Sequence, residues 1–343
     1  MKTIVAHNAK DLRIEEAEMP SPGTGQVLIR MEAGGICGSD LHYYNHGGFG
    51  TVRLKEPMIL GHEVAGQIES LGPDVKNLEE GQRVAISPSR PCGDCAYCRE
   101  GSHNHCLNMR FYGSAMPFPH IQGAFREYIV VDATQCAIAD GLSAGEAAMA
   151  EPLSVVLHAA KGAGDLMGKR VLVTGCGPIG MLAIIVARAA GAIEIVATDV
   201  APFTLEKARE IGADAIHNVA EESDPFSTYS ADKGHFDVLF ECSGVAAALA
   251  STIPAMRPGA TIMQLGLGGD MTLPVQAMTA KELQLRGSFR FHEEFFTAVK
   301  MMHNGRLDVK PLITHSFPIS EVVPAFEMAA DRSQAIKAQI VFA

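Results

Sequence analysis

KRVLVTGCGPIGMLAIIVARAAGA, at residues 169–192, decides the fold. A β-branched run is followed by a glycine-rich turn and a long apolar segment, which predicts a strand, a tight turn and a helix. The turn is a G-x-G-x-x-G, whose glycines let the backbone approach a pyrophosphate at the N-terminus of the helix. The stretch therefore predicts a dinucleotide-binding unit. The expected cofactor contacts in this turn are Gly175, Gly177, Pro178, Ile179 and Gly180.

A second strand, IEIVATD at residues 193–199, ends in Asp199, about 20 residues after the glycines. An acid at this spacing accepts hydrogen bonds from the adenosine ribose hydroxyls. A 2′-phosphate beside Asp199 would be repelled unless an Arg or Lys compensated it, and residues 200–205 contain neither. NAD is therefore predicted over NADP.

Strand and helix patterns continue to alternate through residues 236–244 and 261–269. Alternation of this kind predicts an α/β fold with a doubly wound parallel sheet. Residues 1–132 differ, because short apolar runs such as QVLIRMEA and QRVAISP alternate with Gly and Pro clusters. That pattern predicts a compact, mostly β domain in the first part of the chain.

The length and net charge of the chain limit the number of domains and the kinds of partner that are expected. The chain has 343 residues, enough for about two domains, and 47% of them are hydrophobic. A formal charge of -11 argues against nucleic-acid and anionic-membrane partners, which need clustered Lys and Arg. We expect small-molecule partners. The N-terminus turns polar too early for a signal peptide and residues 179–187 are too short to span a bilayer, so we expect a cytoplasmic protein.

Two stretches of the first part carry a candidate metal site, GGICGSDLHYY at residues 34–44 and GHEVAGQIESLGPDV at residues 61–75. They offer Cys37, His62 and Glu63. A thiolate, an imidazole and a carboxylate are ligands that a catalytic zinc takes while it keeps one position open. A single Cys is more often a small buried side chain than a metal ligand, and a single His is more often a polar side chain with ordinary hydrogen bonds. Their combination predicts a catalytic zinc.

A second candidate site lies in PCGDCAYCREGSHNHC at residues 91–106, where the cysteines are spaced C-x2-C-x2-C-x7-C. Four thiolates complete a tetrahedron, so the pattern predicts a closed structural zinc. A disulfide cluster is the alternative, and it does not suit a reducing cytosol. His103 and His105 are rival ligands that we expect to be solvated. The ligands expected for this second zinc of the chain are Cys92, Cys95, Cys98 and Cys106.

The spacing GHE-x2-G-x5-G-x2-V and the four-cysteine lobe together resemble the zinc-containing medium-chain dehydrogenases, the family of alcohol, sorbitol and threonine dehydrogenases. The resemblance covers essentially the whole chain. It implies a GroES-like β-barrel catalytic domain at residues 1–150 and 290–343, with the zinc lobe at 88–110. It also implies a Rossmann NAD-binding domain at residues 151–289, inserted between the two catalytic parts.

The resemblance assigns roles around the catalytic zinc. Residues that match Cys37 and His62 bind the metal, while Glu63 and Glu151 supply its carboxylate ligand or alternate in that role. The sequence leaves open which carboxylate is bound. Asp40 matches an acid that accepts a hydrogen bond from the metal-bound histidine.

The resemblance also implies a proton relay and a nicotinamide pocket. Ser39 and His42 are spaced as in the family's relay from the substrate hydroxyl to solvent. Without that context they would be a turn serine and a surface histidine. Two loops of the second half are expected to lie against the nicotinamide. The contacts expected there are Leu265, Gly266, Leu267, Ser288, Phe289 and Arg290.

The expected substrate is a sugar acid. Tyr43, Phe111 and Arg290 match positions that line the pocket in the polyol branch of the family, and Glu151 resembles that branch as well. GICGSDLHYY, MRFYGSAMPFPH and RGSFRF resemble members that oxidise a sugar acid, so we expect oxidation of L-idonate to 5-keto-D-gluconate. The candidate partners of the substrate carboxylate are Arg110, Arg126 and Arg290.

Two other interpretations remain. A sorbitol- or xylitol-type polyol dehydrogenase shares every zinc and cofactor residue and differs only in the substrate pocket. A zinc-stabilised or quinone reductase-like protein without alcohol chemistry typically lacks the metal ligands. This chain keeps them, as Cys37, His62, Glu63 and Glu151. The resemblance implies a homo-oligomer, either a tetramer or a dimer.

Overall fold

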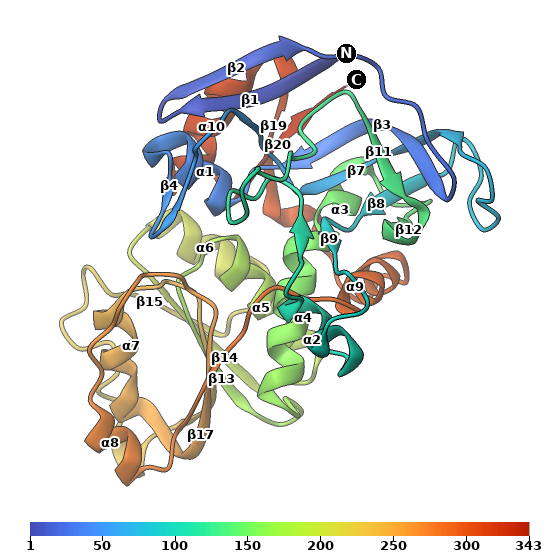
Figure 1. Ribbon diagram of the computed structural model, residues 1–343. Coiled ribbons are helices and arrows are strands. Elements are labelled where there is room, and N and C mark those ends of the chain that lie inside the picture. Colours follow the sequence, from blue (N-terminus) through green and yellow to red (C-terminus); the bar gives the residue numbers. More distant parts are fainter. Residues whose placement is uncertain (343) are drawn as a thin grey trace.

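The computed structural model describes residues 1–342. Figure 1 shows an upper body, which holds both chain termini, and a lower body built on a parallel sheet. We call them the barrel body and the parallel-sheet body. Helix α4 (Ala150–Ala163) runs between the two. No helix in the described part of the chain is long and apolar enough to cross a membrane.

The barrel body is centred on β3, which pairs antiparallel with β7, β11 and β20. The seven-stranded sheet runs in the order β12-β8-β7-β3-β20-β19, with β11 on β3 outside this path. Strands from the C-terminal end therefore complete a sheet that begins near the N-terminus. The strands of this body are β1 (Lys2–Asn8), β2 (Asp11–Glu16), β3 (Gln26–Gly35), β4 (Gly48–Phe49), β5 (Val52–Arg53), β6 (Met58–Ile59), β7 (Glu63–Leu71), β8 (Arg83–Ile86), β9 (Ser89–Arg90), β10 (Arg110–Phe111), β11 (Tyr128–Asp132), β12 (Cys136–Ile138), β19 (Ile313–Pro318) and β20 (Lys337–Val341).

Short helices connect these strands. The one that matters for function is α1, which begins directly after Cys37, the residue that caps its N-terminus. Gly47, with φ 66°, ends it in the left-handed region that glycine tolerates. The α-helices of this body are α1 (Gly38–His46), α2 (Ala96–Arg99), α3 (Ala144–Ala148) and α10 (Val322–Ala330), and the 3-10 helices of the chain are η1 (His103–His105), η2 (Ala133–Gln135), η3 (Ala231–Lys233), η4 (Ile253–Ala255), η5 (Lys310–Leu312) and η6 (Ile319–Glu321).

The lower body confirms the predicted doubly wound parallel sheet. Its strand order is β15-β14-β13-β16-β17-β18, and every neighbouring pair is parallel. Strand order reverses beside β13, which is where such sheets bind nucleotides. The elements of this body, together with the helix α9 that follows it, are β13 (Arg170–Thr174), β14 (Glu194–Asp199), β15 (Ala215–Asn218), β16 (Phe236–Glu241), β17 (Met256–Gln264), β18 (Gln284–Gly287), α5 (Pro178–Ala189), α6 (Pro202–Glu210), α7 (Ala246–Thr252), α8 (Val275–Ala280) and α9 (Glu294–His303).

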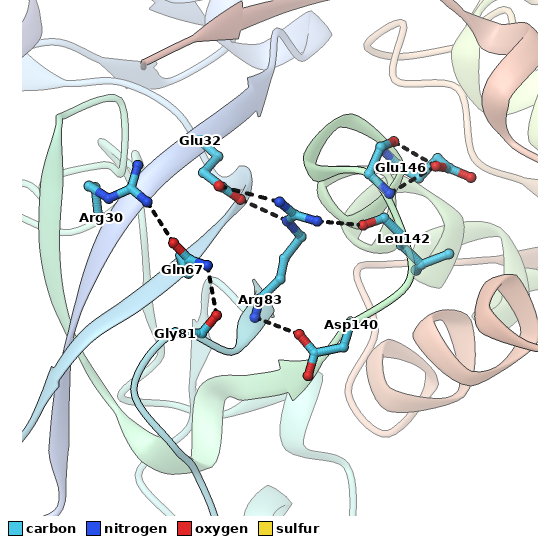
Figure 2. A network of polar contacts seen from close by, with 9 residues as sticks. Arg30, Glu32, Gln67, Gly81, Arg83, Asp140, Leu142 and Glu146 are labelled. Carbon is cyan, nitrogen blue, oxygen red and sulfur yellow. Dashed lines mark hydrogen bonds and ion pairs between the residues drawn. The ribbon is translucent and has the colours of Figure 1, made fainter.

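Figure 2 shows how Arg83 on β8 fastens the segment that leads into α3. Its guanidinium donates to both carboxylate oxygens of Glu32 on β3, at 2.7 and 3.3 Å, and to the carbonyl of Leu142 at 2.9 Å. Its backbone N–H donates to Asp140 at 2.8 Å. Helix α4 follows α3 directly and carries Glu151, so these bonds help to fix the approach of Glu151 to the barrel.

One apolar core runs through both bodies. It includes Ala65 of the barrel, Leu153 and Val156 of α4, and Val173 and Leu182 of the parallel-sheet body, all fully buried. Burying a large apolar side chain contributes about 1.5–3 kcal/mol. Since α4 contributes to this shared core, it packs against both the barrel body and the parallel-sheet body.

Candidate active site

Cys37, His62 and Glu63 meet at one point of the barrel body. Each offers one ligand atom, and these atoms all lie within 4.8 Å of one another. The register of β3 and β7 pairs Gly35 with Glu63, which brings the two ligand-bearing stretches together. A Cβ added to Gly35 would lie 2.2 Å from a carboxylate oxygen of Glu63. Glycine at this position is therefore required to make room for the carboxylate.

Asp40 supports both ligand-bearing segments. It is fully buried and accepts hydrogen bonds from the N–H groups of Cys37 at 3.0 Å and of Gly61 at 3.2 Å. Its Oδ1 lies 3.8 Å from Nδ1 of His62, which is longer than a hydrogen bond. That Nδ1 is buried and has no hydrogen-bond partner. The predicted contact between Asp40 and His62 is thus close but not formed in this geometry.

Lys337 on β20 holds Glu63 and was missed in the sequence. Its Nζ donates to the two oxygens of Glu63 at 2.8 and 2.7 Å and to the carbonyl of Ile36 at 3.2 Å. Both side chains of the pair are only 2% exposed. Burial alone would lower the pKa of Lys337, but the charges of Glu63 and Cys37 raise it, so the ammonium form is maintained. A lysine inside the apolar run AIKAQIVF is the signal that marks such a buried cation.

Glu151 lies buried beside the same cluster. Burial raises its pKa to about 8, against the opposing influence of His62, and Glu63 adds to the rise. Among the described residues, the group of mutually close ligand atoms contains Glu63 and does not contain Glu151. This geometry favours Glu63 as the carboxylate nearest to a metal.

The cluster fits a zinc ion by its donor set. A thiolate, an imidazole nitrogen and a carboxylate oxygen are the ligands that open zinc sites use. Burial raises the pKa of the Cys37 thiol to about 12, and Glu63 contributes to the rise. A bound cation would offset that cost, because the thiolate is the metal-binding form. The unpartnered ring nitrogen of His62 is consistent with a histidine held for such a role.

The four cysteines of the lobe also meet. Their sulfur atoms lie within 4.8 Å of one another, and all four are free thiols. Backbone N–H groups of Cys92 and Asn108 donate to the sulfur of Cys106 at 3.2 and 3.3 Å. Hydrogen bonds from the backbone of Cys98 and Leu107 lower the pKa of Cys95 to about 6. Amide donors aimed at sulfur stabilise thiolates, so this cluster fits a closed zinc site.

The histidines of the lobe differ from expectation. Neither belongs to the cysteine cluster, but the prediction that both are solvated is wrong for His103. Its ring is half-buried and stacks on His292 at 4.1 Å, and the ring of His105 stacks on Phe289 at 6.0 Å. The physical reason is that the lobe packs against the loop that follows β18.

The glycine turn lies between β13 and α5. Gly177 caps the N-terminus of α5, and Gly175 has φ 83°. A Cβ added to Gly180 would lie 1.9 Å from the carbonyl oxygen of Gly175, so only glycine fits there. Asp199, at the end of β14, accepts hydrogen bonds from the N–H of Cys176 at 2.6 Å and of Val200 at 2.7 Å. Asp199 therefore lies against the turn, at the edge where a dinucleotide binds.

The two loops expected near the nicotinamide follow β17 and β18. Leu267 is 84% exposed, and the buried hydroxyl of Ser288 has no hydrogen-bond partner. Both features suit a surface that a ligand covers. Glu241, which the sequence did not single out, organises this edge: it is fully buried and accepts hydrogen bonds from the N–H of Ser243 at 2.9 Å and the side-chain amide of Gln264 at 2.6 Å.

Ser39 and His42 lie on the first turns of α1. The Ser39 side chain hydrogen-bonds with Cys37 and thereby opposes the rise of the thiol pKa. His42 is largely exposed. Its pKa is lowered mainly by the part of the ring that is covered and, to a smaller degree, by the neighbouring His46. Ser39 thus lies beside the metal cluster, and His42, one turn further along α1, faces solvent.

Two of the three predicted substrate residues, Phe111 and Arg290, lie beside the metal cluster. The ring of Phe111 lies 5.7 Å from that of His62, and the guanidinium of Arg290 lies 4.3 Å above the Phe111 ring. Tyr43 is buried, and its hydroxyl accepts a hydrogen bond from the N–H of Ala115 at 3.0 Å. The contacts of Phe111 bring His62 and Arg290, which are distant in the sequence, to the same place.

The three candidate arginines differ in their surroundings. Arg126 is half-buried and its guanidinium donates to the carbonyl of Gly123, so it is committed to the fold. Arg110 is exposed on β10. Arg290 is half-buried with φ 56°, and burial lowers its pKa. Of the three, Arg290 is the cation that contacts Phe111, beside His62.

Comparisons with known proteins agree with this arrangement. Residues 23–141 match the alcohol dehydrogenase GroES-like domain, and residues 178–304 match the zinc-binding dehydrogenase family. L-idonate 5-dehydrogenase (NAD(P)(+)) from Escherichia coli is 45% identical over 92% of this chain and 92% of its own length. Human sorbitol dehydrogenase is 38% identical over 95% of this chain and 91% of its own length.

Solved structures show the same relationship. The crystal structure of L-idonate 5-dehydrogenase from Escherichia coli superposes with a TM-score of 0.95 at 42% identity, over 99% of this chain and 98% of the other. 2R,3R-butanediol dehydrogenase from Bacillus subtilis gives 0.90 at 28% identity, over 100% and 99%. These matches confirm the predicted fold class, a GroES-like barrel with a Rossmann sheet. The chain belongs to the zinc-binding dehydrogenases with an alcohol dehydrogenase GroES-like domain, which makes it a zinc-dependent oxidoreductase of the medium-chain type.

Proposed function

We propose that this dehydrogenase oxidises a secondary hydroxyl group of a sugar acid, with L-idonate as substrate and 5-keto-D-gluconate as product. The observation that carries the proposal is Arg290. Within residues 1–342 its half-buried guanidinium has no ion-pair partner, and it stacks on Phe111 beside the metal cluster. A cation without a counter-ion in such a pocket suits a substrate carboxylate. The relative named for L-idonate supports the same substrate.

Each residue of the proposed site has a separate role. Cys37, His62 and Glu63 would hold the catalytic zinc, which supplies Lewis acidity that lowers the pKa of the substrate alcohol. Lys337 keeps Glu63 in place through two hydrogen bonds. Glu151 is buried beside the same cluster, and its carboxyl group can hydrogen-bond a neighbouring substrate hydroxyl.

Ser39 and His42 form the proposed proton exit. The Ser39 hydroxyl lies against the Cys37 thiol, close to where the substrate oxygen would bind. His42 follows at i+3 on α1, so the two share a helix face. Because the pKa of His42 is lowered, its ring is neutral at physiological pH and can accept a proton before releasing it to solvent.

The proposed hydride acceptor is NAD. Its pyrophosphate would lie on the turn at Gly177, its adenosine ribose at Asp199, and its nicotinamide against the loops at residues 265–267 and 288–290. No Lys or Arg occurs at residues 200–205, and Thr204 is buried with its hydroxyl bonded to the carbonyl of Ala201, so nothing there would balance a 2′-phosphate.

We also propose that residues 1–150 and 290–343 form the catalytic domain and residues 151–289 the cofactor domain. The pairing of β20 with β3 supports this division. A homo-oligomer is proposed as well, because β18 is an exposed strand at the edge of the parallel sheet. The four thiols of the lobe favour a reducing compartment such as the cytoplasm.

The test is an NAD-reduction assay with L-idonate, D-gluconate, sorbitol, xylitol and L-threonine, and in reverse with 5-keto-D-gluconate. We expect the highest kcat/KM with L-idonate. At saturating NAD, Arg290→Met should raise KM for L-idonate about 100-fold and KM for sorbitol less than about threefold, because only the acid loses a charge-assisted pair. Arg110→Met removes an exposed charge and should change neither value.

Three outcomes would count against the proposal. Equal effects of Arg290→Met on the acid and the uncharged polyol would remove the carboxylate role. A higher kcat/KM with sorbitol or xylitol than with L-idonate would support the polyol dehydrogenase instead. A single zinc per chain, confined to the four cysteines, together with no alcohol oxidation would support a purely structural zinc protein.

A further inference from the structure

A cation from the barrel body lies against the phosphate-binding turn of the parallel-sheet body. A Cβ built on Gly177 would lie 3.0 Å from Nη1 of Arg332 and 3.6 Å from its Cζ. Arg332 belongs to the segment between α10 and β20, which joins the barrel sheet. The absence of a side chain at Gly177 therefore lets a guanidinium approach the N-terminus of α5.

A hydrogen-bonded turn built on Asp331 holds the backbone of Arg332. The Asp331 carboxylate accepts hydrogen bonds from the N–H of Ser333 at 2.9 Å, from its hydroxyl at 2.6 Å, and from the side-chain amide of Gln334 at 2.7 Å. These bonds lower the pKa of Asp331. The Asp331 carbonyl also accepts the N–H of Ala335 at 3.0 Å. The turn is thus ordered, and the carboxylate next to Arg332 is occupied by other donors.

The guanidinium of Arg332 has no fixed partner of its own. It is exposed, and within residues 1–342 it forms neither an ion pair nor a hydrogen bond. The first turn of α5 contains no acidic residue that could take this role. The first N–H groups of a helix have no intrahelical acceptors, and its dipole favours an anion there. A free cation and free amide donors therefore converge on one point.

We propose that Arg332 is the counter-ion of the dinucleotide pyrophosphate. A guanidinium donates two parallel hydrogen bonds to phosphate oxygens, which adds charge neutralisation to the amide donors of the turn. Because Arg332 and Gly177 belong to different bodies, the bound dinucleotide is held by both and ties them together. The inference rests on dinucleotide binding by this family and is independent of which alcohol is oxidised.

The experiment titrates the zinc-loaded enzyme by calorimetry with NADH, ADP-ribose and adenosine. In Arg332→Gln, we expect Kd to rise about tenfold for NADH and ADP-ribose, the loss of one exposed charge-assisted contact. Adenosine has no phosphate and should bind unchanged. Arg332→Lys should recover part of the affinity, since a lysine keeps the charge but not the fork of donors. Arg306→Gln, which removes the same charge from the exposed turn after α9, should bind all three ligands normally.

Two results would overturn the role of Arg332, and a third would overturn the cofactor assignment. An unchanged Kd for NADH in Arg332→Gln overturns the counter-ion role. Equal weakening of adenosine and NADH also overturns it, because this would indicate a distorted fold and not a lost phosphate contact. If the unmodified enzyme fails to bind NADH, the cofactor assignment itself is wrong, and the role of Arg332 fails with it.

Discussion

The ion pair between Lys337 and Glu63 is buried, so its two partners depend on each other. Lys337→Met would leave the Glu63 carboxylate without its cation in a site that is closed to water. Removing one partner of such a pair costs about 3–5 kcal/mol. We therefore expect the free energy of unfolding of metal-free protein, measured with urea, to fall by about that amount. With zinc bound, the loss should be smaller, because the metal would offset the same negative charge.

The matched control neutralises both partners. Lys337→Met combined with Glu63→Gln removes both charges, and this double variant should recover most of the lost free energy. If the double variant is as unstable as the single one, the loss comes from the packing of the lysine stem and not from an unpaired carboxylate.

Single residues were predictable from the sequence where their chemistry is local. Cys37 and His62 stand in short motifs whose ligand types point to zinc without any tertiary knowledge. The apolar run AIKAQIVF marks Lys337 as a buried cation, but its partner was not predictable, because Glu63 is 274 positions away. Glu241 was not predicted as a buried residue for a similar reason. The hydrogen-bond donors that stabilise its buried carboxylate come from the ends of neighbouring strands, which only the folded structure brings together.

At the scale of elements, α4 and α9 meet through Glu294. Its carboxylate lies 3.3 Å from His158 and 3.4 Å from Lys161, both on α4. The nearby His158 ring is the main reason that the pKa of Glu294 is well below its ordinary value of 4.5. A lowered carboxyl pKa adds stability above the unfolded-state pKa, and this contribution is lost as the pH falls below it. We expect Glu294→Gln to lose about 1–2 kcal/mol of unfolding free energy at pH 7.

The pH dependence distinguishes this ionic contribution from simple packing. The difference between Glu294→Gln and unmodified protein should shrink as the pH falls from about 4.5 toward 3, measured by urea unfolding at each pH. Glu293→Gln changes the exposed neighbour and should match the unmodified protein throughout. A constant difference between pH 3 and pH 7 would show that Glu294 stabilises the helix contact without its charge.

Elements were predictable to different degrees. The strand, turn and helix over residues 169–192 were correct, because β-branched and apolar periodicity and the glycine spacing are properties of the local sequence. Helix α1 was not predicted from the sequence. Its helical start depends on Cys37 as the N-cap and Asp40 as the reciprocal partner, a capping box with an unusual first residue.

At the scale of the whole molecule, the four-cysteine lobe is connected to the loop that carries Arg290. The sequence predicted both metal clusters but not this connection, because nothing local links His103 to His292, whose rings stack at 4.1 Å. The loop at residues 288–292 carries Arg290, whose guanidinium lies above Phe111. A closed metal site in the lobe therefore supports the position of a residue that the proposed function assigns to the substrate.

Asn104 offers a direct measurement of this support. Its side-chain amide is buried and donates to the backbone carbonyl of Phe289 at 3.0 Å. Asn104→Ala would leave that carbonyl unpaired at a cost of about 1 kcal/mol, so local opening and amide exchange at residues 288–292 should accelerate about fivefold. Hydrogen-exchange mass spectrometry of the zinc-loaded enzyme measures this, with Glu100→Ala, an exposed change elsewhere in the lobe, as the matched control that should exchange normally. Identical exchange of this loop in both variants would mean that other contacts hold Arg290 in place, and the lobe would then be a separate stabilising unit.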